Sequence, residues 1–227
     1  SEGTTGLRIN ERFKGREDLE ILSIDPALRK DPAERKKLIN ASDVTILCLP
    51  DAAAKEAVSL VENDCVRIID TSTAHRTASG WAYGFPELSP EFRKKIREGK
   101  RIANPGCHAS GFVALVYPLI REGILPADYP VSSFSLTGYS GGGKKMIAQY
   151  EAEERSEELD APREYGLNQQ HKHLKEMTAI TGLAVPPLFT PIVADYYSGM
   201  VVSVPLYTGM LKKSLTPEEL RDFFAEY

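Results

Sequence analysis

A cysteine stands directly after a Pro-Gly turn and just before an apolar run that is typical of a helix. The stretch is residues 104–111, Asn-Pro-Gly-Cys-His-Ala-Ser-Gly, and the apolar residues 112–117 follow it. The first N–H groups of a helix lack partners and carry partial positive charge, which stabilises a thiolate, the nucleophilic form of cysteine. Cys107 is therefore a candidate nucleophile. The alternative is a small buried hydrophobic residue, as most free cysteines are.

Two histidines, His171 and His173, flank Lys172 in a polar segment. In an extended loop their side chains point the same way, whereas in a helix they diverge. Histidine gives and takes a proton near neutral pH, which makes the pair a candidate general acid and base, although a single histidine is more often structural. We expect His108 to point along another face of the helix and to be a supporting residue at best. His75 is ambiguous.

The first residues are similar to the end of a glycine-rich phosphate turn. Two glycines stand three apart with two threonines between them, ahead of a helix expected at residues 7–13; the four residues are Gly3, Thr4, Thr5 and Gly6. Such a turn lets the backbone approach a phosphate at a helix N-terminus. The signal is weak by itself, because short turns of this kind are frequent. The chain has no initiator Met, and we expect a preceding strand to be missing from it.

An acidic residue ends the strand expected at residues 19–24, about 20 residues past the glycines, where a ribose hydroxyl would be met. That residue is Asp25, and Arg29 and Lys30 follow it closely. The two basic side chains could instead receive a 2′-phosphate. The residues alone therefore leave NAD and NADP open as cofactors.

These features suggest one reaction class. A thiolate attacks an activated carboxyl group to give a thioester, a reduced nicotinamide delivers hydride to the acyl carbon, and the thiohemiacetal collapses to an aldehyde. A histidine can protonate the developing oxyanion and assist its collapse. An arginine such as Arg76 can hold a carboxylate or phosphate through its bidentate fork.

Apolar runs in the first half alternate with helical patterns. Strands are expected at residues 44–49 and 66–70, helices at 31–40 and 52–61 with Asp51 as an N-cap, and a surface helix at 91–99. The run 44–49 is expected to be buried on both faces, and residues 80–90 to form a packed loop over the sheet. Short connections between such elements indicate a Rossmann-like, doubly wound parallel sheet. Ligands bind at the carboxyl ends of its strands, where Pro50, Ser72 and Arg76 fall.

The second half is dominated by strands. Residues 130–139 alternate like a half-exposed antiparallel strand, and a glycine-rich loop at 140–145 opens a helix that turns acidic by 151–158. A helix is expected at 174–181, strands at 187–193 and 199–207, and a capped helix start at Thr216. We expect a second α+β domain on a mixed or antiparallel sheet. The domains are then 1–106 for the dinucleotide and 107–227 for catalysis and oligomerisation.

Bulk composition excludes several classes of protein. A net charge of −4 and a pI near 5.7 give no reason to expect nucleic-acid binding, and no apolar run is long enough for a membrane span. The three cysteines form no CxxC pair and look like reduced thiols, so we expect a cytoplasmic protein. Metal binding is not expected, because the histidine pair has no cysteine partners nearby.

Five motifs in order resemble the semialdehyde dehydrogenase superfamily, and within it the shorter subtype of the N-acetyl-gamma-glutamyl-phosphate reductases of arginine biosynthesis. The matching segments are residues 2–7, 69–76, 104–107 and 140–144, and 171–173 with Glu176. Relative to the family pattern, the first strand and the C-terminal return to the cofactor domain are missing, so we expect an incomplete enzyme.

The resemblance implies NADPH-dependent reduction of N-acetyl-5-glutamyl phosphate to N-acetylglutamate 5-semialdehyde. Cys107 would carry the thioacyl group, and His173, or less favourably His171, would be the acid/base. The implied cofactor residues are Gly3, Thr4, Thr5, Gly6, Pro50, Ser72 and Gly142; the implied substrate residues are Arg76, Asn104 and His171. A homodimer or homotetramer is implied, built through the second domain's sheet.

Three other interpretations remain open. Aspartate-semialdehyde dehydrogenases share the chemistry but usually carry a different residue before the cysteine. A nucleotide-sensing module without turnover would leave Cys107 and the histidine pair without a role. A cysteine hydrolase would not need the cofactor turn.

Overall fold

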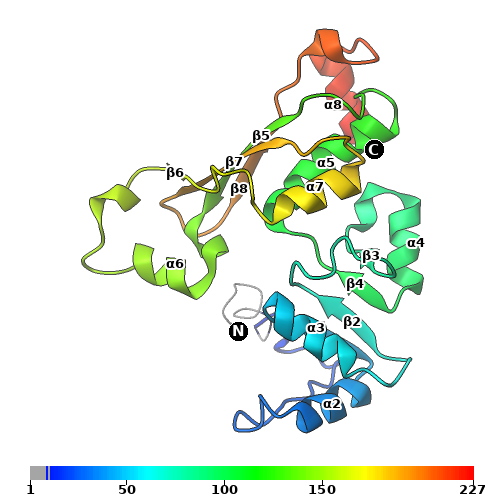
Figure 1. Ribbon diagram of the computed structural model, residues 1–227, viewed down its shortest axis with the longest axis vertical. Helices are drawn as coiled ribbons and strands as arrows, with labels where there is room; N and C mark the ends of the chain where they lie inside the picture. The colour runs from blue at the N-terminus through cyan, green and yellow to red at the C-terminus, as the bar shows by residue number, and fades with distance from the viewer. Residues whose placement is uncertain (1–8, 10) are drawn as a thin grey trace. The chain divides into compact units, whose positions relative to one another are not determined.

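The computed structural model describes residue 9 and residues 11–227, so the glycine turn at residues 3–6 lies outside the described residues. The described chain divides into two compact units (Figure 1). The first holds the described residues up to Pro105 together with Ser140–Ala152, and the second holds Gly106–Tyr139 and Glu153–Tyr227.

A four-stranded parallel sheet, sheet A, forms the centre of the first unit, with strand order β1-β2-β4-β3. Its strands are β1 (Val44–Leu47), β2 (Arg67–Asp70), β3 (Ala82–Tyr83) and β4 (Arg101–Ala103). The helices of this unit are α2 (Pro32–Ala41), α3 (Asp51–Ser59), η1 (Pro86–Leu88), α4 (Pro90–Glu98) and α6 (Gly143–Tyr150). The parallel, Rossmann-like arrangement expected from the sequence is confirmed.

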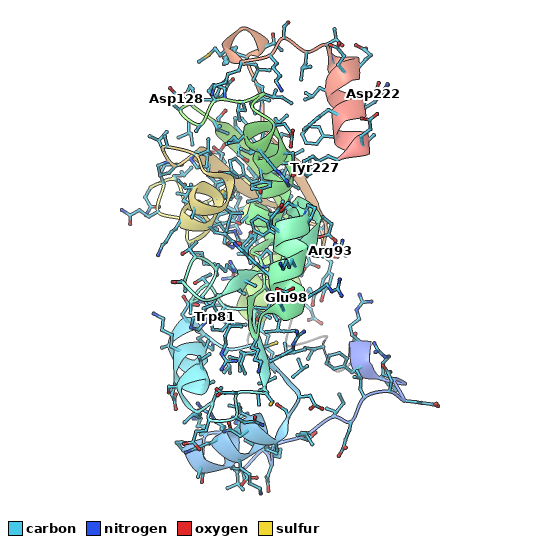
Figure 2. The ribbon with its side chains drawn as sticks, turned by 90° about the vertical axis from the view of Figure 1, so that its right-hand side faces the viewer. Trp81, Arg93, Glu98, Asp128, Asp222 and Tyr227 are labelled. Atoms are coloured by element: carbon cyan, nitrogen blue, oxygen red, sulfur yellow. The ribbon has the colours of Figure 1, made fainter. Side chains whose placement is uncertain are left out.

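Local sequence signals place these helices. Asp31 caps α2, since its carboxylate accepts the N–H groups of Ala33 and Glu34. Ser89 caps α4 in the same way, and this helix carries exposed charged residues, Arg93 and Glu98, on its surface (Figure 2). One buried apolar cluster of this unit consists of Ile39, Leu47, Ala57, Val66 and Ile68.

Four sequence expectations for this unit are wrong. Residues 19–24 form no strand, and Leu19, Ile21 and Leu22 are exposed. An extended run becomes a strand only where a neighbour accepts its backbone hydrogen bonds, and no described strand pairs with this one. Strand β1 is at the edge of the described sheet A, and its residue Val44 is exposed, so this strand is not buried on both faces. Residues 80–90 are more than a covering loop, because β3 joins the sheet beside β4.

The fourth error concerns the start of α3. Pro50 is the N-cap, and Asp51 is the first helical residue. The Asp51 carboxylate accepts the backbone N–H of Thr73 at 2.9 Å and also bonds the Thr73 hydroxyl. The Asp51 carboxylate thus bonds the loop after β2 instead of capping the first turn of its own helix.

The second unit is built on a mixed sheet, sheet B, with order β6-β7-β5-β8. Its strands are β5 (Ser132–Gly138), β6 (Arg163–Glu164), β7 (Leu188–Ala194) and β8 (Met200–Ser203). Its helices are α5 (Cys107–Arg121), α7 (His173–Thr181) and α8 (Pro217–Glu226), together with the 3-10 turns η3 (Glu157–Leu159) and η4 (Thr208–Met210). The 3-10 turn η2 (Tyr139–Gly142) begins in this unit and ends in the first. The expected α+β domain with a mixed sheet is confirmed.

Two details of β5 and of α6 differ from expectation. Strand β5 pairs antiparallel with β8 but parallel with β7, so it is a central strand of a mixed sheet. The acidic residues 151–158 are not a continuation of a helix, because α6 ends at Tyr150. A run of like charges repels itself when it is wound into consecutive helical turns.

The polarity of β5 runs against the usual rule. Ser133, Ser135 and Thr137 are buried, whereas Phe134 is 46% exposed. Helices α5 and α7 lie side by side on one side of sheet B (Figure 1). A buried hydroxyl without a hydrogen-bond partner is destabilising, so hydroxyl groups on this face of β5 are candidates for hydrogen bonds with side chains packed against it.

The C-terminal helix begins as its sequence predicts. Thr216 and Glu219 form a complete capping box around the first turn of α8. At the other end of the helix, the Arg121 guanidinium of α5 donates to the Tyr227 hydroxyl at 3.4 Å. Across the described part of the chain, no helix combines the length and apolarity that crossing a bilayer requires.

Candidate active site

Cys107 is the first residue of α5, as the Pro-Gly turn predicts, and its side chain is exposed. Gly106 is the N-cap, no side chain caps this end of the helix, and the first turn contains no acidic residue. The uncapped N–H groups and the helix dipole are therefore available to a negative charge at the first turn. An exposed thiol at this position can act as a nucleophile, and the interpretation as a buried hydrophobic residue is wrong.

A buried carboxylate fixes the residue that precedes the thiol. Glu176 of α7 is 2% exposed and accepts the backbone N–H of Gly106 at 2.8 Å. This bond gives an acceptor to a backbone N–H that would otherwise be buried without one, which would be destabilising. Helix α7 thereby holds the start of α5 in place.

Three imidazole rings gather in this unit. The ring centroids of His171 and His173 are 4.7 Å apart, and each lies 5.7 Å from the ring of His108. The histidine pair predicted from the sequence is thus brought together, although His173 opens α7 and His171 precedes it. His108 points along another face of α5 than Cys107, as expected, since its side chain is buried whereas that of Cys107 is exposed, and its ring joins this cluster.

His108 is buried between two hydroxyl groups. Its Nδ1 lies 2.6 Å from Ser135 Oγ of β5, and its Nε2 lies 2.7 Å from the Tyr165 hydroxyl. Burial, with a further contribution from His171, lowers the pKa of His108 to about 4, so it is neutral at physiological pH. Neither Ser135 nor Tyr165 was a candidate from the sequence, and the only signal was the row of hydroxyl residues on alternate positions of β5.

His171 sits at the half-buried edge of the cluster. Its Nδ1 accepts the backbone N–H of His173 at 3.2 Å, so the proton of the neutral ring is on Nε2. Burial, together with the charge of Lys172, lowers the pKa of His171. The loop before it is held by Gln169, whose amide pairs with both backbone groups of Phe189 at 2.8 and 2.9 Å.

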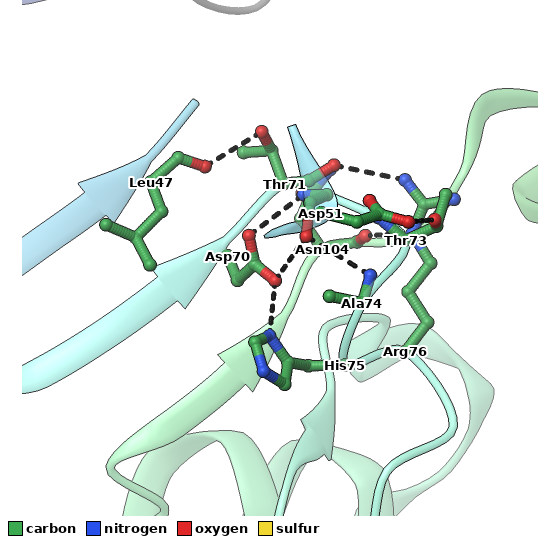
Figure 3. A network of polar contacts seen from close by, with 10 residues as sticks. Leu47, Asp51, Asp70, Thr71, Thr73, Ala74, His75, Arg76 and Asn104 are labelled. Carbon is green, nitrogen blue, oxygen red and sulfur yellow. Dashed lines mark hydrogen bonds and ion pairs between the residues drawn. The ribbon is translucent and has the colours of Figure 1, made fainter. Parts of the chain in front are cut away.

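In the first unit, a buried carboxylate organises the loop after β2 (Figure 3). Asp70 is fully buried, and it accepts the Ser72 N–H at 3.0 Å, the Ser72 hydroxyl at 2.7 Å and a contact from His75 Nδ1 at 2.6 Å. The His75 ring stacks on Trp81 with centroids 4.0 Å apart. His75 is thus a structural residue of this loop.

Arg76 is turned toward the carboxyl ends of two strands of sheet A (Figure 3). Its Nε donates to the Asn104 carbonyl at 2.9 Å and its Nη2 to the Thr71 carbonyl at 3.1 Å. These bonds orient the guanidinium by means of the backbone. Arg76 and Asn104, both expected to bind substrate, are thereby brought together at one edge of the sheet.

The described residues at this edge fit a dinucleotide. Pro50 and Ser72 follow β1 and β2, where ligands of parallel sheets bind, and no side chain caps the first turn of α3. The Ser72 hydroxyl bonds Asp70 and the Ala74 N–H, and the Ser72 backbone N–H also donates to Asp70, so both donors of Ser72 are used within the loop. At Gly142, before α6, an added Cβ would lie 2.5 Å from the sulfur and 2.6 Å from the Cβ of Met146, so a side chain at this position would require Met146 to shift.

Two family models together cover most of the chain. Residues 1–96 match the semialdehyde dehydrogenase NAD binding domain, and residues 107–227 match the semialdehyde dehydrogenase dimerisation domain. Relatives named N-acetyl-gamma-glutamyl-phosphate reductase match nearly the whole chain. The one from Trichormus variabilis is 49% identical over 229 residues, which cover 99% of this chain and 71% of the relative. The one from Burkholderia lata is 44% identical, covering 100% of this chain and 71% of the relative.

The chain belongs to the N-acetyl-gamma-glutamyl-phosphate reductase family. The family resemblance predicted from the sequence is confirmed, and so is the assignment to the semialdehyde dehydrogenase oxidoreductases.

Solved structures show the same fold at lower sequence similarity. An aspartate semialdehyde dehydrogenase from Francisella tularensis has a TM-score of 0.64 at 14% identity and covers 98% of this chain and 76% of that chain. Aspartate semialdehyde dehydrogenase II from Vibrio cholerae has a TM-score of 0.62 at 16% identity, with 81% of this chain and 60% of that chain covered. The high identity to the acetylglutamyl reductases, against this low identity, separates the family from the aspartyl enzymes that share its fold.

Proposed function

We propose that this protein reduces N-acetyl-5-glutamyl phosphate to N-acetylglutamate 5-semialdehyde with NADPH, through a thioacyl group on Cys107. The observation that carries the proposal is an exposed thiol at the uncapped start of α5, in the same unit as a cluster of three imidazoles. The shared name of relatives with up to 49% identity supports the substrate. The domains are 1–106 for the cofactor and 107–227 for catalysis and assembly.

The reaction divides into acylation and reduction. The Cys107 thiolate attacks the acyl carbon, the bond from that carbon to the phosphate oxygen breaks, phosphate leaves, and a thioester forms. When bound, NADPH supplies a hydride for the acyl carbon. A histidine then protonates the developing oxyanion and later removes that proton, so that the carbon–sulfur bond breaks and the aldehyde leaves.

We assign the proton transfers to His173 and substrate binding to His171. His173 is 4% exposed and its position is fixed by the first turn of α7, which suits a group that must meet one atom. His171 is half-buried and in its neutral form presents Nε2–H as a donor, which suits a carboxylate or carbonyl of the substrate. Arg76 and Asn104 complete the substrate contacts in this proposal.

For the cofactor, Gly3, Thr4, Thr5, Gly6, Pro50, Ser72 and Gly142 provide the contacts. NADP is favoured over NAD by Arg29 and Lys30, which are exposed and form no ion pair within the part of the chain that the structure describes. Asp25 accepts the N–H of Ala27 at 2.8 Å, so its carboxylate is partly used within its own turn. A 2′-phosphate needs cationic partners, and a free acidic side chain would oppose it.

The protein assembles, in this proposal, as a homodimer or homotetramer in the cytoplasm. One face of sheet B is apolar and poorly covered; its residues are Phe134, Leu136, Leu188, Ile192 and Val201. An exposed apolar sheet face of this kind marks an interface. Replacing Phe134 by Asp places a charge on this face, and we expect sedimentation velocity to show a smaller particle than wild type. An unchanged particle would reject the sheet face as the interface.

The test of the activity uses the full-length protein in the reverse direction. N-acetylglutamate semialdehyde, phosphate and NADP are supplied, and the reduced-nicotinamide absorbance is followed. We expect phosphate-dependent reduction that disappears in Cys107→Ser and persists in Cys65→Ser, a matched change at another exposed cysteine. Turnover with aspartate semialdehyde instead would change the substrate assignment. No activity with either aldehyde would reject the proposal of an enzyme in favour of a nucleotide sensor.

A further inference from the structure

A buried hydroxyl fixes the proton of His108. Ser135 is fully buried, and within the described part of the chain its Oγ has one hydrogen-bond partner, His108 Nδ1, at 2.6 Å. If Nδ1 carried the proton, the serine hydrogen would be buried without an acceptor, which costs about 1–3 kcal/mol. The serine therefore donates to an unprotonated Nδ1.

The proton of the neutral imidazole is consequently on Nε2. That nitrogen lies 2.7 Å from the Tyr165 hydroxyl, so it donates to the phenol oxygen. A phenol oxygen that accepts a hydrogen bond keeps its own hydrogen for another acceptor. The hydrogen bonds from Ser135 to His108 and from His108 to Tyr165 therefore run in one direction. This hydrogen-bond chain ends in a phenol O–H that can donate to a further acceptor.

The phenol O–H is in the part of the unit that holds the thiol. Tyr165 is partly exposed, its ring lies 6.0 Å from that of His171, and His108 directly follows Cys107 in the first turn of α5. Burial raises the pKa of Tyr165, and the negative charge of Cys107 raises it further, so the phenol stays protonated and remains a donor.

We propose that His108 and Ser135 are positioning residues that aim the Tyr165 hydroxyl as a hydrogen-bond donor at the oxyanion formed on the thioacyl carbon of Cys107. The oxyanion in this inference rests on the proposed function, whereas the direction of the hydrogen-bond chain does not depend on that function. No bond is made or broken by these three residues. They contribute a fixed dipole, which is effective because it need not reorient during the reaction.

The direction of the hydrogen-bond chain is tested without substrate. Nitrogen-15 NMR of the histidine rings should show His108 with an unprotonated Nδ1 and a protonated Nε2 at neutral pH. The signals are assigned with four variants, each of which lacks one of the four histidines. In Ser135→Ala this preference should weaken, because Nδ1 loses its donor. A protonated Nδ1 in the wild-type protein would overturn the proposal, whether or not the enzyme is active.

The role of this hydrogen-bond chain in catalysis is tested by a double-mutant cycle that measures kcat. We expect Tyr165→Phe to lower kcat by about 100-fold, the scale of one oxyanion donor. Ser135→Ala should lower kcat in the wild-type background and leave it unchanged in Tyr165→Phe, because it acts only through the phenol. Ser133→Ala is the matched control, since Ser133 is buried on the same face of β5 and its Oγ has no hydrogen-bond partner among the described residues.

Two results of this cycle would overturn the role in catalysis. The first is an additive effect of Ser135→Ala in both backgrounds, which would indicate general destabilisation. The second is an equal effect of Ser133→Ala and Ser135→Ala. Chemical denaturation of each variant establishes that the compared proteins are folded.

Discussion

Glu176 accepts the backbone N–H of Gly106 at 2.8 Å, and this bond joins α7 to the residue before the nucleophile. Both groups are buried. His173 is three residues before Glu176, so the two side chains lie on adjacent turns of one helix. A single helix thus holds both the proposed acid/base and the anchor of the cysteine turn.

The first prediction concerns this anchor. Glu176→Ala leaves the Gly106 N–H buried without an acceptor, so we expect the free energy of unfolding to fall by about 1–3 kcal/mol. The turnover rate should fall as well, because the start of α5 is no longer fixed. Glu176→Gln keeps a carbonyl oxygen and should recover most of both losses. Urea denaturation and steady-state kinetics measure them, and equal effects of Ala and Gln would show that the hydrogen bond is unimportant.

The second prediction separates the two histidines. His173→Asn should lower kcat by about 10²–10⁴-fold with little change in KM, the pattern of a lost general acid and base. His171→Asn should mainly raise KM, because it removes a substrate contact. Steady-state kinetics with varied acyl phosphate distinguishes the two. The reverse pattern would exchange their roles.

The third prediction is an acid sensitivity due to His108. Its pKa is lowered from 6.5 to about 4 in the folded protein. Below pH 6.5 the unfolded chain binds a proton at this site that the folded protein does not, so stability is full above 6.5 and falls with pH down to about 4. The loss approaches about 3 kcal/mol.

Urea denaturation across this pH range measures the effect in the wild-type protein and in His108→Gln. We expect a shallower dependence on pH in the variant, with a residual slope from His171, whose pKa is also lowered. Identical slopes for the two proteins would show that His108 is not held neutral by the fold.

The fourth prediction concerns the contact of α5 with β8. A Cβ added at Gly111 would lie 2.5 Å from Val202 Cγ2 and 3.0 Å from its Cβ. We expect Gly111→Ala to destabilise by about 1–3 kcal/mol, although alanine favours a helix by about 1 kcal/mol over glycine. Val202→Ala should restore part of the loss in the double variant. A Gly111→Ala protein as stable as wild type would contradict the close approach.

Sequence reasoning succeeded where the signal is local. The start of α5 at Cys107, the capped start of α8 and the parallel strands of sheet A follow from turns, caps and apolar runs within a few residues. The histidine pair was found because its members are two positions apart. These features depend on neighbours in the sequence, which the residue pattern shows directly.

Features that depend on distant partners were missed. The bonds of His108 join it to residues 27 and 57 positions away, and nothing local marks Ser135 or Tyr165 as its partners. The run at residues 19–24 has strand character but no described strand pairs with it. The choice between Pro50 and Asp51 at the start of α3 was decided by Thr73, which lies on another loop.

The most direct test of the central claim is to trap the thioacyl group. The full-length protein is incubated with N-acetyl-5-glutamyl phosphate in the absence of NADPH, quenched in acid and analysed by peptide mass spectrometry. We expect the mass of an N-acetylglutamyl group on the peptide that contains Cys107, none on Cys65, and its loss when NADPH is added before the quench. Acylation of another residue, or none at Cys107 in a protein that still turns over, would contradict the mechanism.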